Sequence, residues 1–371
     1  MVLALVGAAG CGGGAPPTGG DLAGQPVVPS RPLVVRAGRP VEPIAGEERH
    51  LRNVRKLTFG ANNAEAYWSF DGRKLIYQSD RKPFECDQIY MIDLETGQEQ
   101  LVSTGKGKCT CSYFLRGDQE IIYSSTHLRD PNCPIAGRLV RGRYVWPVFP
   151  GFDIFRAKAD GSDLRQLTTT DGYDAEGTVC PVTGRIIFTS LRDGDLDLYT
   201  MEPDGSDVQR VTNREGYDGG AFFSHDGSKI VARSGFFKDE KDRAEYLSFL
   251  AQNLVLPTQV DIVVMNRDGS DFRRVTDNGA ANFAPYWHPD NRRIIFCSNL
   301  VQGETKARSA VDQFDLWLIN EDGSGLERVT TNDSFDGFPM FSPDGKHLAF
   351  ASNRYGTEYG ETSIFVAEWV D

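Results

Sequence analysis

Short hydrophobic runs follow one another along the chain from about residue 50 to its end. Runs such as KLIYQS (74–79), RIIFTS (185–190) and RIIFCS (293–298) have the length of strands, and each is followed by a second run such as IYMID, DLYTM or DLWLI. Apolar runs of this length between turn residues are typical of β-strands. The pattern therefore predicts an all-β domain built from many short strands.

Three signals recur in a fixed order between these runs. A Leu-Thr or Val-Thr type of strand end occurs six times, a turn resembling Ser-Pro-Asp-Gly six times, and an Asp-Gly-Ser type of hairpin turn five times. Asp-Gly supplies the positive backbone dihedral angles that tight hairpins need, so we assign these Asp residues to turns and not to catalysis. Such repetition indicates a repeat architecture of four-stranded units.

Six such units predict a six-bladed β-propeller of four-stranded antiparallel blades over residues 49–371. The last unit ends with its third strand, in SIFVAEWVD, whereas the strand signal NVRKLT at Asn53 has no unit before it. We expect this N-terminal strand to complete the last blade. It would close the ring and cover exposed strand edges.

The repeats resemble those of the TolB-like propeller family. DGDLDLYTMEPDGSDVQRVT from Asp193 and FDLWLINEDGSGLERVT from Phe314 carry the pattern most clearly, and the resemblance covers about residues 50–371. It implies the fold but no single activity, because such blades serve both as binding scaffolds and as accessory domains of hydrolases. TolB itself carries an α/β domain before its propeller. Here that space holds a Gly/Pro-rich segment, so a place in the Tol system does not follow.

The first 48 residues have a different composition. MVLALVGAAGC resembles the lipobox of bacterial lipoproteins, which implies a signal over residues 1–11 and lipidation at Cys11. Residues 12–48 are rich in Gly and Pro and suit a tether. The apolar run is shorter than the ~20 residues of a membrane-spanning helix. We expect a lipoprotein of the bacterial cell envelope, periplasmic or anchored at the outer membrane; the alternative is an uncleaved tail.

The chain is acidic, with a formal net charge of -12 over 371 residues. This charge argues against nucleic acid as a partner, and against membrane contact other than through the lipid anchor. We expect a monomer.

Polar residues precede the innermost strand of each blade. One aligned position is occupied by Asn63, Cys109, Asp174, Asp218, Asn282 and Asp336, and the position two residues later by Glu65, Cys111, Glu176, Gly220, Ala284 and Phe338. Because side chains alternate along a strand with a period of two, we expect both sets to face the central tunnel. The loops that carry them share one face of the propeller, here called the top face, with the loops between the second and third strands.

The expected result is an acidic ring at the tunnel mouth. Its ligand-binding candidates are Asn63, Glu65, Asp174, Glu176, Asp218, Asn282 and Asp336. Ca²⁺ bound by Asp174, Asp218 and Asp336 would compensate the like charges, as would a peptide bearing Lys, Arg or a free amino group. Alternatively, the Asp and Asn side chains cap backbone amides and bind only water.

Long insertions between the second and third strands also lie on the top face, where binding loops often gather. In blade 4 a helix is predicted with Ala244, Leu247, Leu250, Ala251 and Leu254 on one stripe and Pro257 as its stop, packed on the propeller rim. In blade 2 the insertion contains Arg138, Arg141, Arg143, Tyr144, Trp146 and Phe149. These residues either contact a carboxylate, sugar or peptide at the mouth, or the aromatic rings pack beneath the loop while the arginines pair with the acidic ring.

Four cysteines, Cys86, Cys109, Cys111 and Cys133, map to the top of blades 1 and 2. In an exported chain they predict two disulfides. Because Cys109 and Cys111 are too close in sequence to prefer each other, each is expected to pair with Cys86 or Cys133. A site with four thiolates on Zn²⁺ is the alternative.

Signatures of catalysis are weak. The chain has no Gly-x-Ser-x-Gly motif, and its five histidines map to different parts of the fold. A carboxylate pair such as Glu65 and Glu176 suits glycoside chemistry if its spacing is right. We therefore expect a module that binds a protein or peptide through its acidic top face, without catalytic residues. The alternative is a metal-assisted carbohydrate-active enzyme, a lyase or hydrolase, that uses the same mouth.

Overall fold

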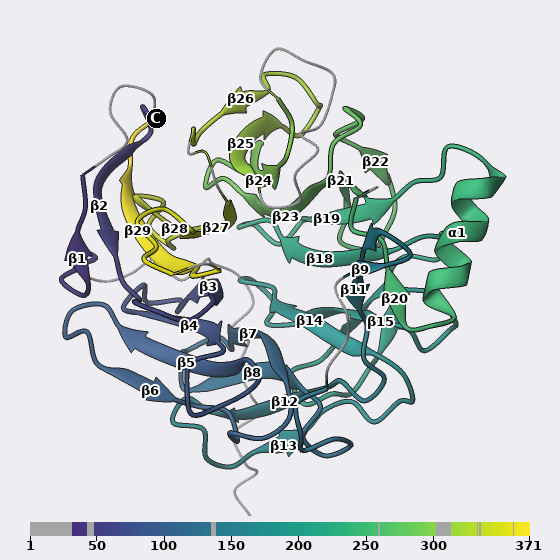
Figure 1. Ribbon diagram of the computed structural model, residues 1–371, viewed down its shortest axis with the longest axis horizontal. Helices are drawn as coiled ribbons and strands as arrows, with labels where there is room; N and C mark the ends of the chain where they lie inside the picture. The colour runs from purple at the N-terminus through teal and green to yellow at the C-terminus, as the bar shows by residue number, and fades with distance from the viewer. Residues whose placement is uncertain are drawn as a thin grey trace, which may run out of the picture.

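Six four-stranded blades are arranged in a ring around a central axis, which confirms the predicted six-bladed β-propeller (Figure 1). The computed structural model describes residues 32–42, 48–134, 139–258, 260–301, 313–331, 333, 335–358 and 360–371. Cys11 and Arg138 lie outside these residues. Within the described part of the chain, no helix has the length and apolar character needed to span a membrane.

The four strands of a blade, named A to D from the tunnel outwards, are antiparallel neighbours. The A strands are β3 (Asn63–Trp68), β7 (Cys109–Phe114), β14 (Asp174–Val179), β18 (Asp218–Phe223), β23 (Asn282–Trp287) and β27 (Asp336–Phe341). The B strands are β4 (Lys74–Ser79), β8 (Glu120–Ser125), β15 (Ile186–Ser190), β19 (Lys229–Gly235), β24 (Arg293–Ser298) and β28 (His347–Ser352). The C strands are β5 (Gln88–Asp93), β12 (Asp153–Lys158), β16 (Asp197–Met201), β21 (Val260–Asn266), β25 (Asp315–Asn320) and β29 (Ser363–Trp369).

The outer D strands are short, which limits the exposed strand edge of each blade. They are β6 (Glu99–Leu101), β13 (Arg165–Gln166), β17 (Gln209–Arg210), β22 (Arg273–Arg274), β26 (Glu327–Arg328) and, in blade 6, the longer β2 (Leu51–Lys56).

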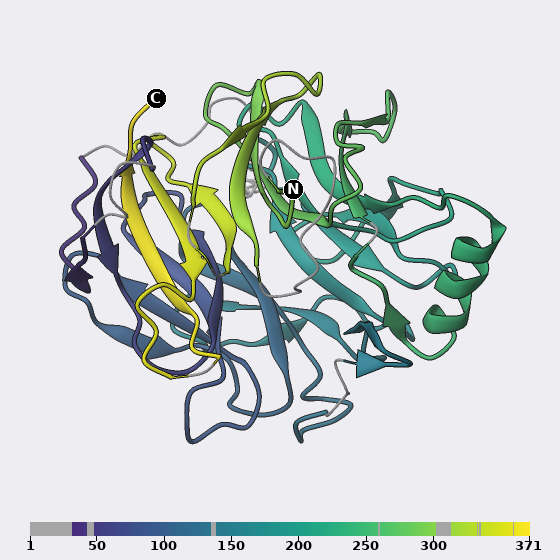
Figure 2. The same cartoon turned by 45° about the horizontal axis from the view of Figure 1, so that its top comes forward.

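The N-terminal strand closes the ring as predicted. Strand β2 pairs antiparallel with the C-terminal strand β29, and Figure 2 shows the purple strand β2 beside the yellow strand β29 in blade 6. Strand β1 (Arg39–Pro40) pairs with β2, and the backbone N–H groups of Arg36 and Ala37 donate to the Leu94 carbonyl in blade 1. Part of the expected tether is therefore attached to the propeller.

The core lies between the blades, where strands of neighbouring blades pack on each other. Aromatic pairs on strands B and C contribute to it, such as Tyr123 with Phe155 and Phe350 with Phe365, whose ring centroids lie 6.2 and 5.6 Å apart. The Asp-Gly turns have the predicted structural role, as in Asp204, whose carboxylate accepts a 2.6 Å hydrogen bond from Ser206 Oγ. This bond lowers the pKa of Asp204.

The insertions of blades 2 and 4 pack on each other. Helix α1 (Glu240–Leu250) begins after the cap Asp239, which accepts from the N–H of Asp242 at 2.9 Å. Its buried residues are Tyr246, Phe249 and Leu250, so the predicted stripe was wrong in most positions and the helix is shorter. Leu254 instead begins β20 (Leu254–Val255), which pairs with β11 (Trp146–Pro147) of the blade 2 insertion. The hairpin of β9 (Leu139–Val140) and β10 (Arg143–Tyr144) precedes β11.

Candidate functional site

Every A strand contains a β-bulge at the same place. The pairing register shifts after the second residue of each A strand. The third residue has a positive φ in all six: Glu65 (55°), Cys111 (47°), Glu176 (62°), Gly220 (56°), Ala284 (49°) and Phe338 (53°). A positive φ is unfavourable for the five that are not glycine, and bulges are common beside functional sites. The six bulges therefore mark the tunnel wall as a candidate site.

The bulges correct the prediction that both aligned sets face the tunnel. The residue with positive φ interrupts the alternation of side chains between the two faces of the strand. In blade 1, Ala64, Glu65 and Tyr67 therefore line the cavity at the top-face end of the tunnel. The six bulge residues all line this cavity. The first set (Asn63, Cys109, Asp174, Asp218, Asn282 and Asp336) is at most 1% exposed and lies within the wall. The prediction was wrong for this set because side chains alternate with a period of two only in a regular strand without a bulge.

Residues of the first set are bonded inside the protein. Asp174 accepts from Arg192 Nη2 at 3.1 Å and Asp336 from Arg354 Nη2 at 2.8 Å. The remaining polar contacts are Asp218 with Ser234 Oγ (2.5 Å), Asn282 with Ser298 Oγ (2.7 Å), and Asn63 Nδ2 with the Thr362 carbonyl (2.9 Å). Burial raises the pKa of Asp218 to about 7.

These contacts give no support to a Ca²⁺ site at Asp174, Asp218 and Asp336. The three carboxylates belong to three different blades, and each has a partner in its own blade. Nowhere among the described residues do three His, Cys, Asp or Glu side chains come together as a possible metal site.

The cavity at the top-face end has a volume of about 890 Å³. Tyr67 and Phe222 line it and belong to an aromatic cluster with Tyr113 and Tyr286, in which neighbouring ring centroids lie 5.2 to 6.3 Å apart. A second cavity of about 60 Å³ lies on the other side, among turns at the opposite end of the tunnel. The aromatic cluster therefore divides the tunnel.

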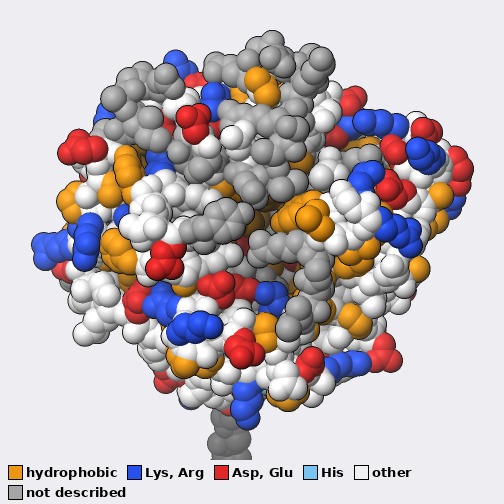
Figure 3. Space-filling view, viewed as in Figure 1, with side chains coloured by type: hydrophobic (Ala, Val, Ile, Leu, Met, Phe, Trp, Pro, Cys, Tyr) orange, Lys and Arg blue, Asp and Glu red, His pale blue; other side chains and the backbone are white. Residues whose placement is uncertain are grey.

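Close to the bulges, the wall of the larger cavity has a polar half and an apolar half. Polar residues of blades 5 and 6, namely Asn299, Asn353, Glu358, Glu361 and Thr362, also line the cavity. The polar half comes from blades 1 to 4 and contains Glu65, Cys111, Tyr173, Glu176, Tyr217 and Arg233. The apolar half comes from blades 5 and 6 and contains Phe283, Ala284, Phe314, Phe335 and Phe338. On the face shown in Figure 3, acidic, basic and hydrophobic side chains lie close together around the centre.

Glu176 and Arg233 form a buried ion pair in the polar half. Their side chains are 10% and 9% exposed, and Arg233 Nη2 lies 2.5 Å from Glu176 Oε1. Glu176 also accepts from Tyr217 OH (2.6 Å), Thr189 Oγ1 (2.7 Å) and the Gly220 N–H (2.7 Å). Burial opposes ionisation, but Arg233 and these donors hold the pKa of Glu176 below its ordinary value. Glu176 is thus an ionised carboxylate with its oxygens already bonded.

Glu65 lines the same cavity, and its pKa is displaced in the opposite direction. Its Oε2 accepts from Tyr67 OH at 3.3 Å. Burial raises the pKa of Glu65, and the negative charge of Glu176 raises it further. Burial and the charges of Glu65 and Glu176 also raise the pKa of Cys111 well above its ordinary value. Both groups are therefore harder to ionise than they are in water.

Replacing Glu65 by Gln is expected to stabilise the protein at pH 7 but not near pH 4. Unfolded Glu releases its proton at about pH 4.3, whereas folded Glu65 retains it to higher pH, so rising pH favours unfolding of the wild type. Glutamine does not titrate, and the variant avoids this loss. Urea unfolding of both proteins at pH 4 and pH 7 measures the difference. A gain that is the same at both pH values would contradict the prediction, and exposed Glu85→Gln serves as the control.

Sequence reasoning missed Arg233 and the meaning of Gly220. The fifth residue of strand B is Arg233 in blade 4, whereas the other blades have Gln78, Ser124, Thr189, Cys297 and Ala351 at the corresponding position. Arg233 pairs with Gly219 across the sheet, next to the bulge glycine. A Cβ atom on Gly220 would lie 2.1 Å from Arg233 Nη1, so the glycine makes room for the guanidinium. Arg233 is the one charged residue at this position among the six blades, and this difference in the sequence could have indicated a special role.

The blade 2 insertion divides between the cavity and helix α1. Tyr144 and Trp146 line the cavity, and the Arg233 guanidinium lies 5.4 Å from the Trp146 ring centroid. Arg143 pairs instead with Glu245 of α1 at 3.2 Å, and Arg141 lies over the ring of Phe249 at 5.8 Å. The predicted arginine and aromatic group is therefore split. Its aromatic residues border the cavity, and its described arginines hold the helix.

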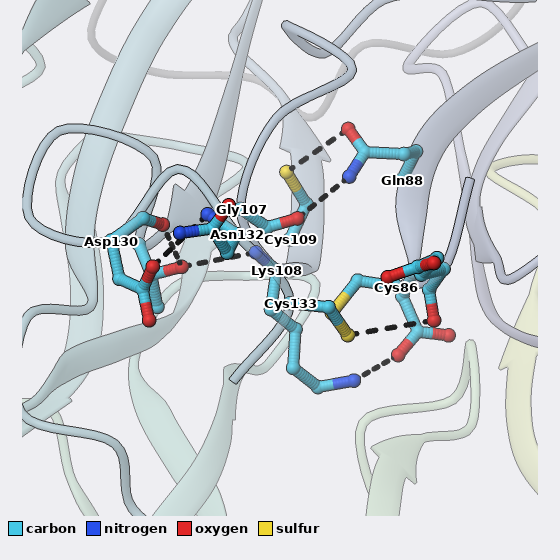
Figure 4. The surroundings of a disulfide bond; sticks show 11 residues. Cys86, Gln88, Gly107, Lys108, Cys109, Asp130, Asn132 and Cys133 are labelled. Atoms are coloured by element: carbon cyan, nitrogen blue, oxygen red, sulfur yellow. Dashed lines mark hydrogen bonds and ion pairs between the residues drawn. A yellow bond between two sulfur atoms is a disulfide. The ribbon is translucent and has the colours of Figure 1, made fainter. Parts of the chain in front are cut away.

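The cysteines form a different pattern from the expected one. Cys86 is bonded to Cys133, which joins the insertions of blades 1 and 2 (Figure 4). Cys109 and Cys111 are free. The expected pairing was wrong because Cys109 points into the wall, with its Sγ 3.4 Å from Ser125 Oγ, whereas Cys111 faces the cavity. The four thiols therefore do not meet as a zinc site.

Comparison with known sequences gives only partial matches. No protein-family model matches the chain. Uncharacterized protein Atu1656 of Agrobacterium fabrum is 34% identical over 92 residues, 25% of this chain and 28% of that protein. Uncharacterized peptidase YuxL of Bacillus subtilis is 26% identical over 123 residues, 26% of this chain and 19% of that protein. The chain thus matches less than a third of the length of either relative.

Comparison with solved structures covers most of the chain. A structure assigned to TolB of Agrobacterium tumefaciens aligns with a TM-score of 0.54 and 18% identity, covering 84% of this chain and 91% of that chain. A gluconolactonase of Xanthomonas campestris aligns with a TM-score of 0.55 and 15% identity, covering 93% of this chain and 99% of that chain. An oligogalacturonate lyase in complex with manganese aligns with a TM-score of 0.50 and 14% identity, covering 85% of this chain and 79% of that chain. At these identities the likeness concerns the fold. This chain therefore has the six-bladed β-propeller fold, and its repeats resemble those of TolB-like propellers.

Proposed function

We propose that this protein is an extracytoplasmic binding module that holds a peptide, or an extended segment of a protein partner, in the tunnel cavity. The observation that carries the proposal is one cavity of about 890 Å³ whose wall, close to the bulges, has an aromatic half and a polar half. Ligand sites commonly combine apolar walls with a few fixed polar groups. Aromatic rings suit apolar side chains, and the polar half offers partners to a peptide backbone.

The location in the cell envelope is supported by the Cys86–Cys133 disulfide. Disulfides persist in oxidising compartments such as the periplasm and are rare in the cytosol. Anchoring through a lipid on Cys11 is the part of this proposal that rests on the signal-like sequence alone. The partner is therefore expected to be another exported protein or peptide.

A carbohydrate-active enzyme is the second candidate. Glu65 and Glu176 line one cavity with pKa values displaced in opposite directions, which is the arrangement of an acid and a carboxylate in glycoside chemistry. Glu176, however, already accepts bonds from Arg233, Tyr217, Thr189 and Gly220, so it has little capacity left to attack a sugar or to activate water. We therefore favour binding over catalysis.

Filling the cavity tests the proposal. Ala284→Phe places at one bulge the residue that Phe338 already places at another with nearly the same φ, so the backbone should tolerate it. Val208→Phe, on an exposed site, is the matched control. A pool of random hexapeptides is dialysed against each protein, and retained and cleaved peptides are identified by mass spectrometry. We expect wild type and Val208→Phe to retain peptides intact, and Ala284→Phe to retain them at least tenfold more weakly. Equal retention by all three proteins would contradict binding in the cavity, and cleavage products would contradict a pure binding role.

A further inference from the structure

The Arg233 guanidinium has donors that the protein does not use. An arginine carries five N–H donors in a planar fork. Nη2 contacts Glu176 Oε1 and the Tyr217 hydroxyl, whereas within the described part of the chain neither Nε nor Nη1 has a hydrogen-bond acceptor. A buried donor without a partner is unfavourable. An acceptor brought by a ligand would offset this cost.

Of these donors, Nη1 lies at the cavity surface, whereas Nε is buried. All six bulge residues line the cavity, but five of them have a side chain and the sixth, Gly220, has none. Arg233 Nη1 occupies the place where a Gly220 Cβ would stand, within 2.1 Å of it. The guanidinium thus substitutes for the missing side chain in the ring of bulge residues.

Charge favours an anionic acceptor over a cationic one. Glu176 compensates Arg233 and has its oxygens occupied, so it offers little to a ligand ammonium group. Burial and the charge of Glu176 raise the pKa of Glu65, so Glu65 takes up a proton, with which it can donate to an incoming carboxylate, more readily than a free glutamate does. A carboxylate on an arginine forms a charge-assisted hydrogen bond, which is stronger than a neutral one.

The surroundings of Arg233 indicate what is attached to that carboxylate. Trp146 lies over the guanidinium and packs edge-on against Phe283, with ring centroids 5.5 Å apart. Phe283 in turn contacts Phe338 at 5.9 Å. A continuous aromatic surface therefore leads from the guanidinium to the apolar half of the cavity. A hydrophobic side chain next to a carboxylate fits this surface.

We infer that Arg233 binds the C-terminal carboxylate of the peptide or protein partner, with the last side chain of that partner packed on Trp146, Phe283 and Phe338. This inference rests on the proposed function and specifies which end of the ligand enters the cavity.

The test compares two forms of one peptide pool. Random hexapeptides ending in Leu or Phe are prepared as free acids and as C-terminal amides, and each pool is dialysed against the full chain. We expect the acids to be retained at least tenfold more strongly than the amides. Equal retention would overturn the inference but leave peptide binding intact. Failure to retain either pool, whether or not a galacturonate oligomer is retained instead, would overturn the proposed function as well.

Two variants locate the effect at Arg233. Arg233→Lys keeps the positive charge beside Glu176 but removes Nη1, and Gly220→Ala places a Cβ against Nη1. Both are expected to retain acids and amides equally, while Val208→Phe behaves as wild type. A persistent tenfold preference for acids in both folded variants would overturn the assignment to Arg233. If either variant fails to fold, as judged by circular dichroism, the comparison of free acids with amides on the wild type still tests whether the protein recognises the C-terminal carboxylate.

Discussion

Replacing Arg354 by Met is expected to destabilise the protein by about 3–5 kcal/mol, because the change leaves two buried carboxylates without their cation. Arg354 Nη2 lies 2.8 Å from both Glu48 Oε1 and Asp336 Oδ2, and all three side chains are at most 2% exposed. Glu48 precedes the ring-closing strand β2, whereas Asp336 begins the innermost strand of blade 6. The ion triad therefore ties the N-terminal segment to the blade that it completes.

Arg192 provides the matched control in blade 3. It bonds Ser190 Oγ (2.8 Å) and Asp174 (3.1 Å) in the same way that Arg354 bonds Ser352 Oγ and Asp336. Among the described residues, no second carboxylate corresponding to Glu48 bonds Arg192. Its side chain is also more exposed, at 16%. Arg192→Met should cost clearly less than Arg354→Met in urea unfolding at pH 7, followed by tryptophan fluorescence. Equal losses would mean that the contact with Glu48 adds nothing to ring closure.

Repeats made the fold predictable from sequence. Each turn and strand signal occurs several times, so one degenerate copy, such as the turn at Cys180, is corrected by the others. The pairing of β2 with β29 followed from a count of strands. Such inferences need only local chemistry and connectivity, and both are visible in the sequence.

The site was harder to predict because it depends on the bulges. Glu65 and Glu176 were placed correctly in the tunnel, but Asp174 and Asp336 were placed there by an alternation that the bulges interrupt. Sequence patterns do not reveal a Glu or Phe with a positive φ in a strand, since these residues rarely adopt this backbone conformation. Arg233 was missed for a related reason. Its role depends on a glycine in the neighbouring strand, which is a contact across the sheet and not a motif along the chain.

Removing one member of the Glu176–Arg233 pair is expected to destabilise the protein by about 3–5 kcal/mol, whereas removing both should cost much less. Glu176→Leu leaves a buried guanidinium without its carboxylate, and Arg233→Met leaves a buried carboxylate without its guanidinium. The double variant leaves neither charge, and apolar residues of similar volume can fill the space. Urea unfolding at pH 7 of the wild type, both single variants and the double variant forms a complete double-mutant cycle.

The two outcomes of this cycle separate a role in the fold from a role in binding. If the losses in the free energy of unfolding of the two single variants simply add in the double variant, the two charges act independently and do not stabilise each other as an ion pair. If the double variant is nearly as stable as the wild type yet no longer prefers peptide acids to amides, the propeller does not need the pair for its stability. The buried charges then serve the ligand, since a tunnel lined by apolar residues at these positions would fold equally well but offer no donor to a carboxylate.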